Sequence, residues 1–244
     1  KIYKLKVLYF TKYTRKGASS RLRSYQYFPK LEEQGIQVDV RPLFNDIYLK
    51  KIYNGKKSKL LALKFYLKRL FVLFSISKYD KVVIEKELFP YFPAWFEWLF
   101  KTFKIKFIVD YDDAIFHNYD KHPNPLIRIY LGHKIDKVMK YSSCVIAGNS
   151  YLADRAKSAG AQRVEIIPTV IDVERYKQID GNKSSQKTII GWIGSPSTFK
   201  YVLQIEEILE NIVNNYNAKI HIIGSGTGRL SFEKNIKYIK WHED

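Results

Sequence analysis

Short apolar runs alternate with longer amphipathic segments along almost the whole sequence, and this alternation restricts the fold more than any other feature. The runs are rich in Val and Ile, and the segments between them carry apolar residues three or four positions apart, the spacing of one helix face. Strands that alternate with helices form a parallel sheet with helices on both faces. We therefore predict an α/β fold whose ligands lie at the carboxyl ends of the strands.

The same pattern gives the expected elements in chain order. We predict strands at residues 6–10, 37–44, 81–85, 106–109, 144–147, 164–167, 189–193, 219–223 and 236–240. Helices are expected at residues 20–34, 56–77, 90–101, 126–141 and 150–160, the last of these capped by Ser150. A further helix should run through Val213 with Ser197 or Thr198 as its N-cap.

These elements divide into two Rossmann-like domains with parallel sheets. We expect a first domain at residues 1–168, a linker at 169–186 and a second domain at 187–244, because Pro168 ends a strand and a polar stretch without periodicity follows. The last segment holds too few elements to close a doubly wound domain. We therefore expect the second domain to be incomplete here and to continue beyond Asp244.

A strong positive charge indicates an anionic partner. The formal net charge is +18 and the sequence pI is near 9.7, and such a field attracts nucleic acid, phosphorylated substrates or an anionic membrane surface. Charge alone does not choose among them. The basic residues are spread over helices rather than set on a fold that reads bases, which makes nucleic acid the weakest of the three.

Cysteine and histidine usage excludes several kinds of site. The single cysteine, Cys144, lies in an apolar run and cannot form a disulfide framework. The five histidines form no ligand-spaced pair on a helix face, so we expect no metal and no cofactor. No signal-peptide pattern precedes the first strand, and we expect a cytoplasmic protein.

Residues 56–77 form a basic and very apolar helix that leaves two interpretations open. Its lysines exclude a bilayer-spanning segment, but together with the aromatic side chains of Trp95, Trp98 and Phe103 it could face anionic lipid. Alternatively, it packs on the sheet and its lysines extend to water.

Carboxylates follow two of the predicted strands. Asp110, Asp112 and Asp113 come at the end of one strand, where they could bind a sugar hydroxyl or orient a nucleophile, or else cap a helix. Three carboxylates this close repel one another unless a ligand or a basic neighbour compensates. The triplet of Glu85, Lys86 and Glu87 should open onto the same cleft, unless it is only a solvated charge run.

Two loops have the small residues that phosphate binding favours. The first contains Gly17, Ser19, Ser20, Arg21 and Arg23, in which arginine offers a fork suited to phosphate. An ordinary solvated helix start explains these residues as well. His117, shortly after the aspartates, is a further candidate for substrate contact.

The second loop lies in the second domain. Residues 191–198 form a strand end, a small-residue turn and a helix start, which together present free backbone N–H groups to a phosphate. An ordinary strand-to-helix corner is the alternative. The glycine-rich run 224–228 follows another strand, but it does not match the dinucleotide-binding spacing, which disfavours a dehydrogenase.

The order of elements and three motifs resemble the retaining GT-B glycosyltransferases of family 4 over nearly the whole chain. The motifs are DYDDA at residues 110–114, PTVID at residues 168–172 and GWIGSPST at residues 191–198. The resemblance implies two Rossmann-like domains, a nucleotide diphosphate sugar held mainly by the second domain and an acceptor held by the first. No metal is implied.

The resemblance also assigns roles. Asp110, Asp112 and Asp113 take the catalytic position, where the family usually has a histidine. The donor-binding residues are Gly194, Ser195, Ser197, Thr198, Lys200, Gly224 and Gly226. The acceptor-binding residues are Gly17, Ser20, Arg21, Arg23, Glu85, Lys86, Glu87 and His117. The family's usual arginine is replaced by Ser195, and its E-x7-E element does not occur in the sequence, so we expect the chain as it stands to be inactive.

Two classes of function therefore remain. The first is a retaining glycosyltransferase that passes a sugar to a glycan or lipid-linked acceptor in surface polysaccharide or glycolipid synthesis, in the cytoplasm or peripherally on the inner face of the membrane. The second is a non-enzymatic basic module that binds nucleic acid or a membrane surface.

Overall fold

The computed structural model describes residues 4–53, 58–174 and 188–242. The chain falls into two compact units, and each is built on its own parallel sheet. The first comprises residues 1–46 and 58–172, and the second comprises residues 47–57 and 173–244. Most of the predicted linker lies outside the described residues, and the predicted domain boundaries stay predictions.

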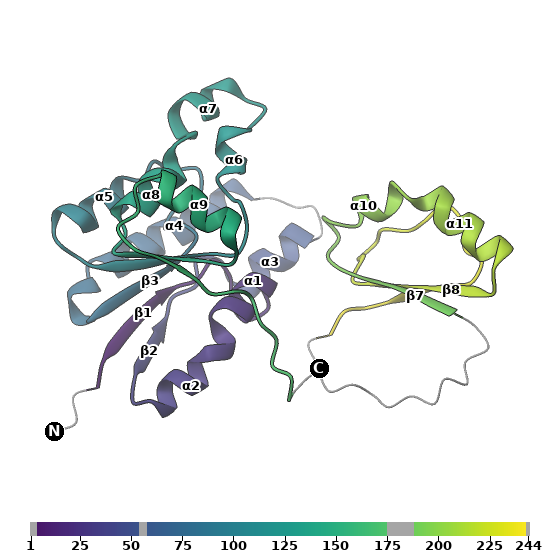
Figure 1. The fold of residues 1–244 in the computed structure, drawn as a ribbon, viewed down its shortest axis with the longest axis horizontal. Helices are drawn as coiled ribbons and strands as arrows, with labels where there is room; N and C mark the ends of the chain where they lie inside the picture. The colour runs from purple at the N-terminus through teal and green to yellow at the C-terminus, as the bar shows by residue number, and fades with distance from the viewer. Residues whose placement is uncertain (1–3, 54–57, 175–187, 243–244) are drawn as a thin grey trace. The chain divides into compact units, whose positions relative to one another are not determined.

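The sheet of the first unit has the order β2-β1-β3-β4-β5-β6, and all of its strands are parallel (Figure 1). All six strands begin within one residue of the predicted positions, although β2 ends earlier than predicted, and the prediction of an α/β fold with parallel sheets is confirmed. The strands are β1 (Lys6–Phe10), β2 (Gln37–Val40), β3 (Lys81–Glu85), β4 (Phe107–Tyr111), β5 (Cys144–Ala147) and β6 (Val164–Ile166).

This strand order creates a switch point between β1 and β3. The chain leaves β1 toward β2 at one edge of the sheet, whereas from β3 onward each strand is added toward the other edge. The two directions of winding leave a crevice at the carboxyl ends of β1 and β3, where ligands bind in open α/β sheets.

Helices cover both faces of this sheet. Figure 1 shows α1 and α2 on one face, with α4, α5, α8 and α9 on the other. The helices are α1 (Ala18–Arg23), α2 (Phe28–Glu33), α4 (Lys59–Leu73), α5 (Trp95–Thr102), α6 (His117–Asp120), α7 (Pro125–Leu131), α8 (Lys134–Tyr141) and α9 (Ser150–Ser158), with short 3-10 turns η1 (Tyr25–Tyr27) and η2 (Ile76–Lys78).

Two helices predicted for the first unit are each divided into two α-helices, as is the helix predicted through Val213 in the second unit, which forms α10 (Lys200–Leu203) and α11 (Glu206–Asn215). Residues 20–34 form α1, η1 and α2, and Pro29 lies in the first turn of α2, where its missing N–H is tolerated. Residues 126–141 form α7 and α8, which are separated by Gly132 and His133. The N-cap of α9 is Asn149 rather than Ser150, because the Asn149 side chain accepts a hydrogen bond from the Leu152 N–H.

The core of the first unit lies between the sheet and the helices on its α5 and α8 side. Ile84 and Val109 on the central strands are fully buried, as are Ile135 and Met139 on α8. Burial on both faces explains why the central strands read as continuous apolar runs.

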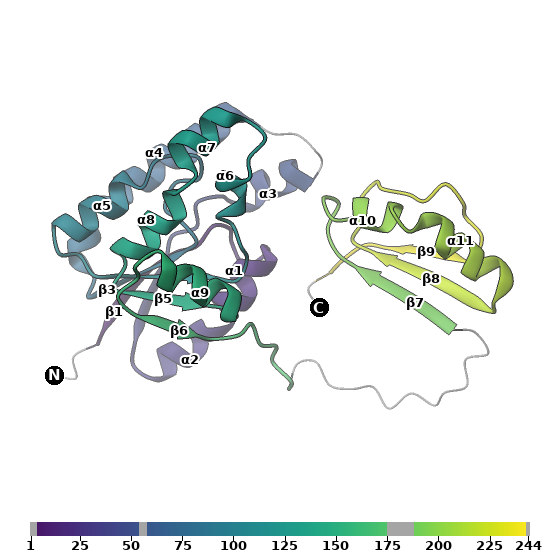
Figure 2. The same ribbon diagram turned by 45° about the horizontal axis from the view of Figure 1, so that its top comes forward.

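The second unit has a three-stranded parallel sheet, order β7-β8-β9, with α11 lying over β8 (Figure 2). Its elements are β7 (Thr188–Ile193), α10 (Lys200–Leu203), α11 (Glu206–Asn215), β8 (Ala218–Ile223) and β9 (Ile236–Ile239), and α3 (Asp46–Tyr53) is grouped mostly with this unit. The prediction of Ser197 or Thr198 as N-cap is wrong. The N-cap of α10 is Phe199, because the Thr198 hydroxyl bonds back to Ser195 within the preceding turn.

Candidate functional site

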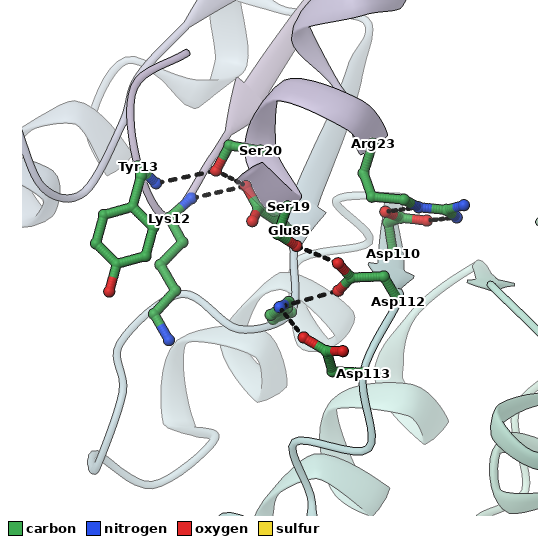
Figure 3. A network of polar contacts seen from close by, with 10 residues as sticks. Lys12, Tyr13, Ser19, Ser20, Arg23, Glu85, Asp110, Asp112 and Asp113 are labelled. Carbon is green, nitrogen blue, oxygen red and sulfur yellow. Dashed lines mark hydrogen bonds and ion pairs between the residues drawn. The ribbon is translucent and has the colours of Figure 1, made fainter. Parts of the chain in front are cut away.

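Charged side chains meet at the switch point of the first sheet. Lys12 follows β1, Lys86 follows β3, and Asp112 follows β4, while Glu85 and Asp110 are register partners on β3 and β4. Figure 3 shows Glu85, Asp110 and Asp112 at this edge beside α1, with Ser20 next to Glu85, Ser19 next to Asp112 and Arg23 next to Asp110. We call this set the switch-point cluster.

Glu85 is the most deeply buried acid of the cluster and is only 3% exposed. Its Oε2 accepts hydrogen bonds from the Ser20 hydroxyl (2.7 Å) and the Lys12 N–H (2.9 Å), and the Ser20 hydroxyl in turn accepts from the Tyr13 N–H (3.2 Å). Its Oε1 is buried without a hydrogen-bond partner among the described residues. Burial raises the pKa of Glu85 above its ordinary value.

Lys86 occupies a strained backbone conformation. The Glu87 N–H donates to the Glu85 carbonyl (2.8 Å), which closes a three-residue turn around Lys86 with a φ of 68°. The Lys86 N–H donates to the Asp110 carbonyl (2.9 Å), which fixes the turn to the neighbouring strand. Strain of this kind at a non-glycine residue is concentrated at functional sites.

The Lys86 ammonium compensates the charge of two aspartates. Its Nζ lies 2.9 Å from Asp112 Oδ1 and 3.0 Å from Asp113 Oδ2. Burial lowers the pKa of Lys86, but the two carboxylates raise it more, so that the net shift is upward. For Asp112, burial raises the pKa, but Lys86 and the Ser19 hydroxyl lower it below its ordinary value. Asp113 keeps a side chain that is 70% exposed.

Asp110 is held by Arg23 within the protein. The guanidinium donates from Nε to Asp110 Oδ2 (3.0 Å) and from Nη2 to Oδ1, and its Nη1 donates to the Ile167 carbonyl (2.6 Å). Both side chains of the ion pair are buried. Arg23 therefore links α1 to the carboxyl ends of β4 and β6, and both oxygens of Asp110 are engaged.

Lys12 is a site residue that the sequence analysis missed. Among the described residues its Nζ forms no hydrogen bond or ion pair, and it lies 5.7 Å from the centre of the Tyr13 ring. Burial lowers its pKa, and the positive charge of Lys86 lowers it further against the opposing effect of Glu85 and Glu87. Its place just after a strand could have identified it, since the same criterion selected the aspartates.

Glu87 and Lys134 form a second buried ion pair next to the cluster in the chain, directly after Lys86. Both oxygens of Glu87 accept from the Tyr119 hydroxyl (2.8 Å), and Lys134 from α8 forms an ion pair with the same carboxylate. The Lys134 Nζ also donates to the Phe89 carbonyl (2.5 Å). The structure therefore places Glu87 in the interior, where it fixes the segment after β3.

The Arg69 side chain of α4 donates hydrogen bonds to backbone carbonyls just after three of the strands. Its Nη2 donates to the carbonyls of Thr11 (2.6 Å) and Arg41 (2.8 Å), and its Nη1 donates to the Leu88 carbonyl (3.1 Å). These carbonyls follow β1, β2 and β3. Burial lowers the pKa of Arg69 to about 9, against a small rise from Glu85.

The remaining first-unit candidates lie around the cluster. Gly17 precedes α1 as its N-cap, and a Cβ there would lie 2.6 Å from the Tyr13 Cβ; Arg21 is half-buried on α1. His117 points elsewhere. Its Nδ1 lies 2.8 Å from Asp120 and its Nε2 lies 2.8 Å from the Tyr151 hydroxyl, so that it joins α6 to α9.

In the second unit the two predicted donor turns touch each other. Gly224 has a φ of +85°, and a Cβ there would lie 2.2 Å from the Gly194 carbonyl oxygen. A Cβ on Gly226 would lie 2.9 Å from the Pro196 ring. Only glycine permits this approach, and it brings the turn after β7 beside the turn after β8.

The turn after β7 uses several of its own N–H groups. The Ser195 N–H donates to the Thr198 hydroxyl (3.0 Å), and the Thr198 and Phe199 N–H groups donate to the Ser195 carbonyl (3.0 and 3.1 Å). The Ser195 and Ser197 hydroxyls lie 2.9 Å apart. Lys200, the first residue of α10, is exposed, and its Nζ lies 5.0 Å from the centre of the Tyr201 ring.

The structure describes residues 4–53, 58–174 and 188–242. In those residues no group of three or more His, Cys, Asp and Glu side chains is placed to hold a metal ion. At the carboxyl end of β4, Asp110 is paired with Arg23, and Asp112 and Asp113 are paired with Lys86.

Comparisons with known proteins give the fold. No family profile and no curated protein matches the chain in sequence. Among solved structures, S. aureus MnaA with UDP matches with a TM-score of 0.61 and 13% identity, over 97% of this chain and 68% of that one. A putative UDP-N-acetylglucosamine 2-epimerase from Listeria monocytogenes matches with a TM-score of 0.60 and 10% identity, over 99% of this chain and 70% of that one.

A third neighbour is the glycotransferase of kitacinnamycin, with a TM-score of 0.54 and 11% identity over 99% of this chain and 72% of that one. These neighbours have two Rossmann-like units of the GT-B type. The chain has a GT-B-type fold. At these identities the similarity concerns the fold alone.

Proposed function

We propose that this chain binds a nucleotide diphosphate sugar and belongs to an enzyme that transfers the sugar to an acceptor hydroxyl. The observation that carries the proposal is the switch-point cluster, a set of buried and strained charged groups at the ligand-binding edge of a GT-B-type fold. Structural neighbours whose titles name UDP, a UDP-sugar epimerase and a glycotransferase support it.

In the proposed reaction the first unit holds the acceptor. Asp113 is an exposed carboxylate that pairs with Lys86 of the cluster, and it would accept a hydrogen bond from the acceptor hydroxyl while Lys86 fixes its orientation. Asp110 would act as a positioning residue, because Arg23 occupies both of its oxygens. Lys12, whose pKa is lowered, would donate a hydrogen bond to the incoming ligand.

The second unit would hold the donor diphosphate at the paired turns after β7 and β8. Gly194, Gly224 and Gly226 allow a close backbone approach, and Lys200 supplies a positive charge. Ser197 and Thr198 add hydroxyl donors. Because Thr198 occupies the Ser195 N–H, ligand binding at this turn would have to exchange that internal hydrogen bond.

We further propose transfer with retention. The bond from the anomeric carbon to the diphosphate oxygen breaks, the acceptor oxygen bonds to the same face of that carbon, and the acceptor proton passes to the departing phosphate. Such a reaction needs stabilisation of charge on the leaving group rather than a protein nucleophile. A glycan or lipid-linked acceptor at the inner face of a membrane fits the net charge of +18.

Epimerisation of a UDP-sugar is the second candidate. The two neighbours with TM-scores of 0.61 and 0.60 carry the titles S. aureus MnaA with UDP and UDP-N-acetylglucosamine 2-epimerase. An epimerase needs no acceptor, and its product remains attached to the nucleotide.

Calorimetric titration with UDP, ADP, GDP and TDP tests the proposal directly. We expect one of these diphosphates to bind, and we expect Lys200→Gln to weaken its binding several-fold through loss of a charged phosphate contact. Lys219→Gln, which removes an exposed lysine from β8, is the matched control and should bind as the parent does.

Chromatography of a reaction with the matching nucleotide sugars separates the two candidates. Release of the nucleoside diphosphate that depends on an added acceptor supports transfer, whereas a changed sugar on an intact nucleotide supports epimerisation. If no diphosphate binds, the nucleotide-sugar proposal is wrong.

A further inference from the structure

The outer face of α4 is an exposed apolar stripe bordered by lysines. Five large apolar side chains recur along it at helical spacing and are exposed, and no acidic residue interrupts the helix. The stripe consists of Leu60, Leu63, Leu67, Phe71 and Phe74, and its bordering lysines are Lys59, Lys64 and Lys68. This helix is not a membrane span, since no helix of the described ranges is long and apolar enough to cross a bilayer.

A basic pocket lies where this stripe ends. It has a volume of about 300 Å³ and is found at the amino ends of β3 and β4, the sheet edge opposite the switch-point cluster. Its floor is apolar and includes Ile76 and Ile105. Its charged lining includes Lys81, Lys104 and Lys106, all of them exposed.

One acid also lines the pocket. Asp80 accepts a hydrogen bond from the Lys6 N–H (2.8 Å), which commits part of its carboxylate to the backbone of β1. Three lysines therefore outnumber one carboxylate, and the pocket favours an anion.

Two exposed aromatic residues lie close in sequence to residues that line the pocket. Phe74 ends α4 two residues before Ile76 and is 80% exposed, and Phe103 ends α5 directly before Lys104 and is 70% exposed. Trp95 and Trp98 on α5 are exposed as well. Exposed rings beside lysines are typical of proteins that insert aromatic groups at a membrane interface.

We infer that this pocket binds the headgroup of an anionic phospholipid while the α4 stripe and the two phenylalanines enter the lipid interface. The inference rests on the membrane part of the proposed function and names the site of contact. Charge complementarity selects the occupant, because α4 and the pocket lining combine apolar side chains with lysines and contain Asp80 as their one acid. A neutral protein partner would gain nothing from these lysines.

Flotation with phosphatidylcholine vesicles that contain phosphatidylglycerol tests the inference. We expect the parent to float with these vesicles, to remain behind with pure phosphatidylcholine vesicles, and to dissociate at high salt. The triple variant Lys81→Gln/Lys104→Gln/Lys106→Gln should bind about a hundredfold more weakly, given the usual contribution of each lysine near an anionic surface. The variant Phe74→Ser/Phe103→Ser should lose binding without any change in charge.

Matched variants in the second unit control for charge and hydrophobicity. Lys219→Gln/Lys237→Gln/Lys240→Gln removes the same charge, and Ile208→Ser/Tyr216→Ser removes two exposed apolar side chains. Both should float as the parent does. Circular dichroism of every variant checks that the fold is retained.

Three results would overturn the inference. Parent binding that the pocket lysines do not affect would leave the membrane proposal standing and reject this site. Absence of vesicle binding would reject both the membrane proposal and this site, and so would binding of phosphate without binding of vesicles. The calorimetric diphosphate titration would still decide nucleotide-sugar binding separately. Loss of self-association instead of flotation in Phe74→Ser/Phe103→Ser would assign the surface to a second copy of the chain.

Discussion

The candidate sites of the two units are built by opposite means. The switch-point cluster of the first unit is fixed by buried charges that pair with one another, such as Arg23 with Asp110 and Lys86 with Asp112. The paired turns of the second unit contain few charges and are fixed by close contact of backbone on backbone, as at Gly224 and Gly194.

This difference indicates how each region responds to change. A buried ion pair is sensitive to the loss of either partner, because the remaining charge is left desolvated. A glycine contact is instead sensitive to added volume. Substitutions that remove a buried charge from the first unit, and substitutions that add volume or charge to the turns of the second unit, can therefore test the comparison.

The largest effect is expected from Lys134→Met in the first unit. Lys134 is 3% exposed, and its removal leaves the Glu87 carboxylate buried with the Tyr119 hydroxyl as its one side-chain partner among the described residues. We expect a loss of about 3–5 kcal/mol in the free energy of unfolding, measured by urea denaturation. The double variant Lys134→Met/Glu87→Gln should recover part of it, and no recovery would contradict the ion-pair explanation.

Gly224→Ala should be next in size and should act on the second unit. The new Cβ would meet the Gly194 carbonyl and would force a positive φ on alanine, for a combined cost of about 3 kcal/mol. Gly35→Ala is the control, because Gly35 has a φ of +79° with open space around it, and about 1 kcal/mol is expected there.

Tryptophan fluorescence can report on the second unit alone. Replacing the exposed Trp95 and Trp98 by Phe leaves Trp192 and Trp241, both in that unit, as emitters. If Gly224→Ala in this background unfolds at the same urea concentration as its parent, the close contact of the two turns does not exist in solution.

A smaller effect is expected from adding charge to the turn after β7. Ser195→Arg should tighten binding of the preferred nucleoside diphosphate about tenfold, since a charge-assisted hydrogen bond would replace a hydroxyl contact. Asn215→Arg adds the same charge at the opposite end of the sheet, at the C-terminus of α11, and should leave the affinity unchanged. Equal effects of the two variants in calorimetry would show only a general response to charge.

The smallest effect concerns the pH dependence of Glu85. Because its pKa is raised in the folded state, its contribution to stability is fully present below pH 4.5 and is lost as the pH rises through the raised value. Glu85→Gln should remove that loss, so that its stability relative to the parent improves on the order of 1 kcal/mol between pH 4.5 and pH 8. If urea denaturation gives the same difference in unfolding free energy between Glu85→Gln and the parent at both pH values, the pKa of Glu85 is not raised.

The sequence predicted the sheets well because period and composition determine them locally. The strands β1, β3 and β5 have the predicted limits, since each is a short apolar run bounded by polar residues. The helices were less predictable. The division of residues 126–141 at Gly132 and the short α10 depend on tertiary packing and on hydrogen bonds within a turn, neither of which has a period.

For the candidate site, the strand-end rule selected residues that the structure brings together, but it did not predict their pairings. It placed Glu85, Lys86 and the aspartates together, whereas the burial of Glu87 against Lys134 joins residues far apart in the sequence. Lys12 was missed although it also follows a strand. Burial lowers the pKa of Lys12 and Lys86 lowers it further, and only the folded chain brings about either effect.

Arg69 connects two surfaces that have been described separately. Its backbone belongs to the helix whose outer face carries Leu67 and Phe71, while its guanidinium grips the carbonyls of Thr11 and Leu88 beside the switch-point cluster. Loss of this one guanidinium would therefore leave the carbonyls of Thr11, Arg41 and Leu88 without their shared donor, and α4 and the three strand ends would lose a common link.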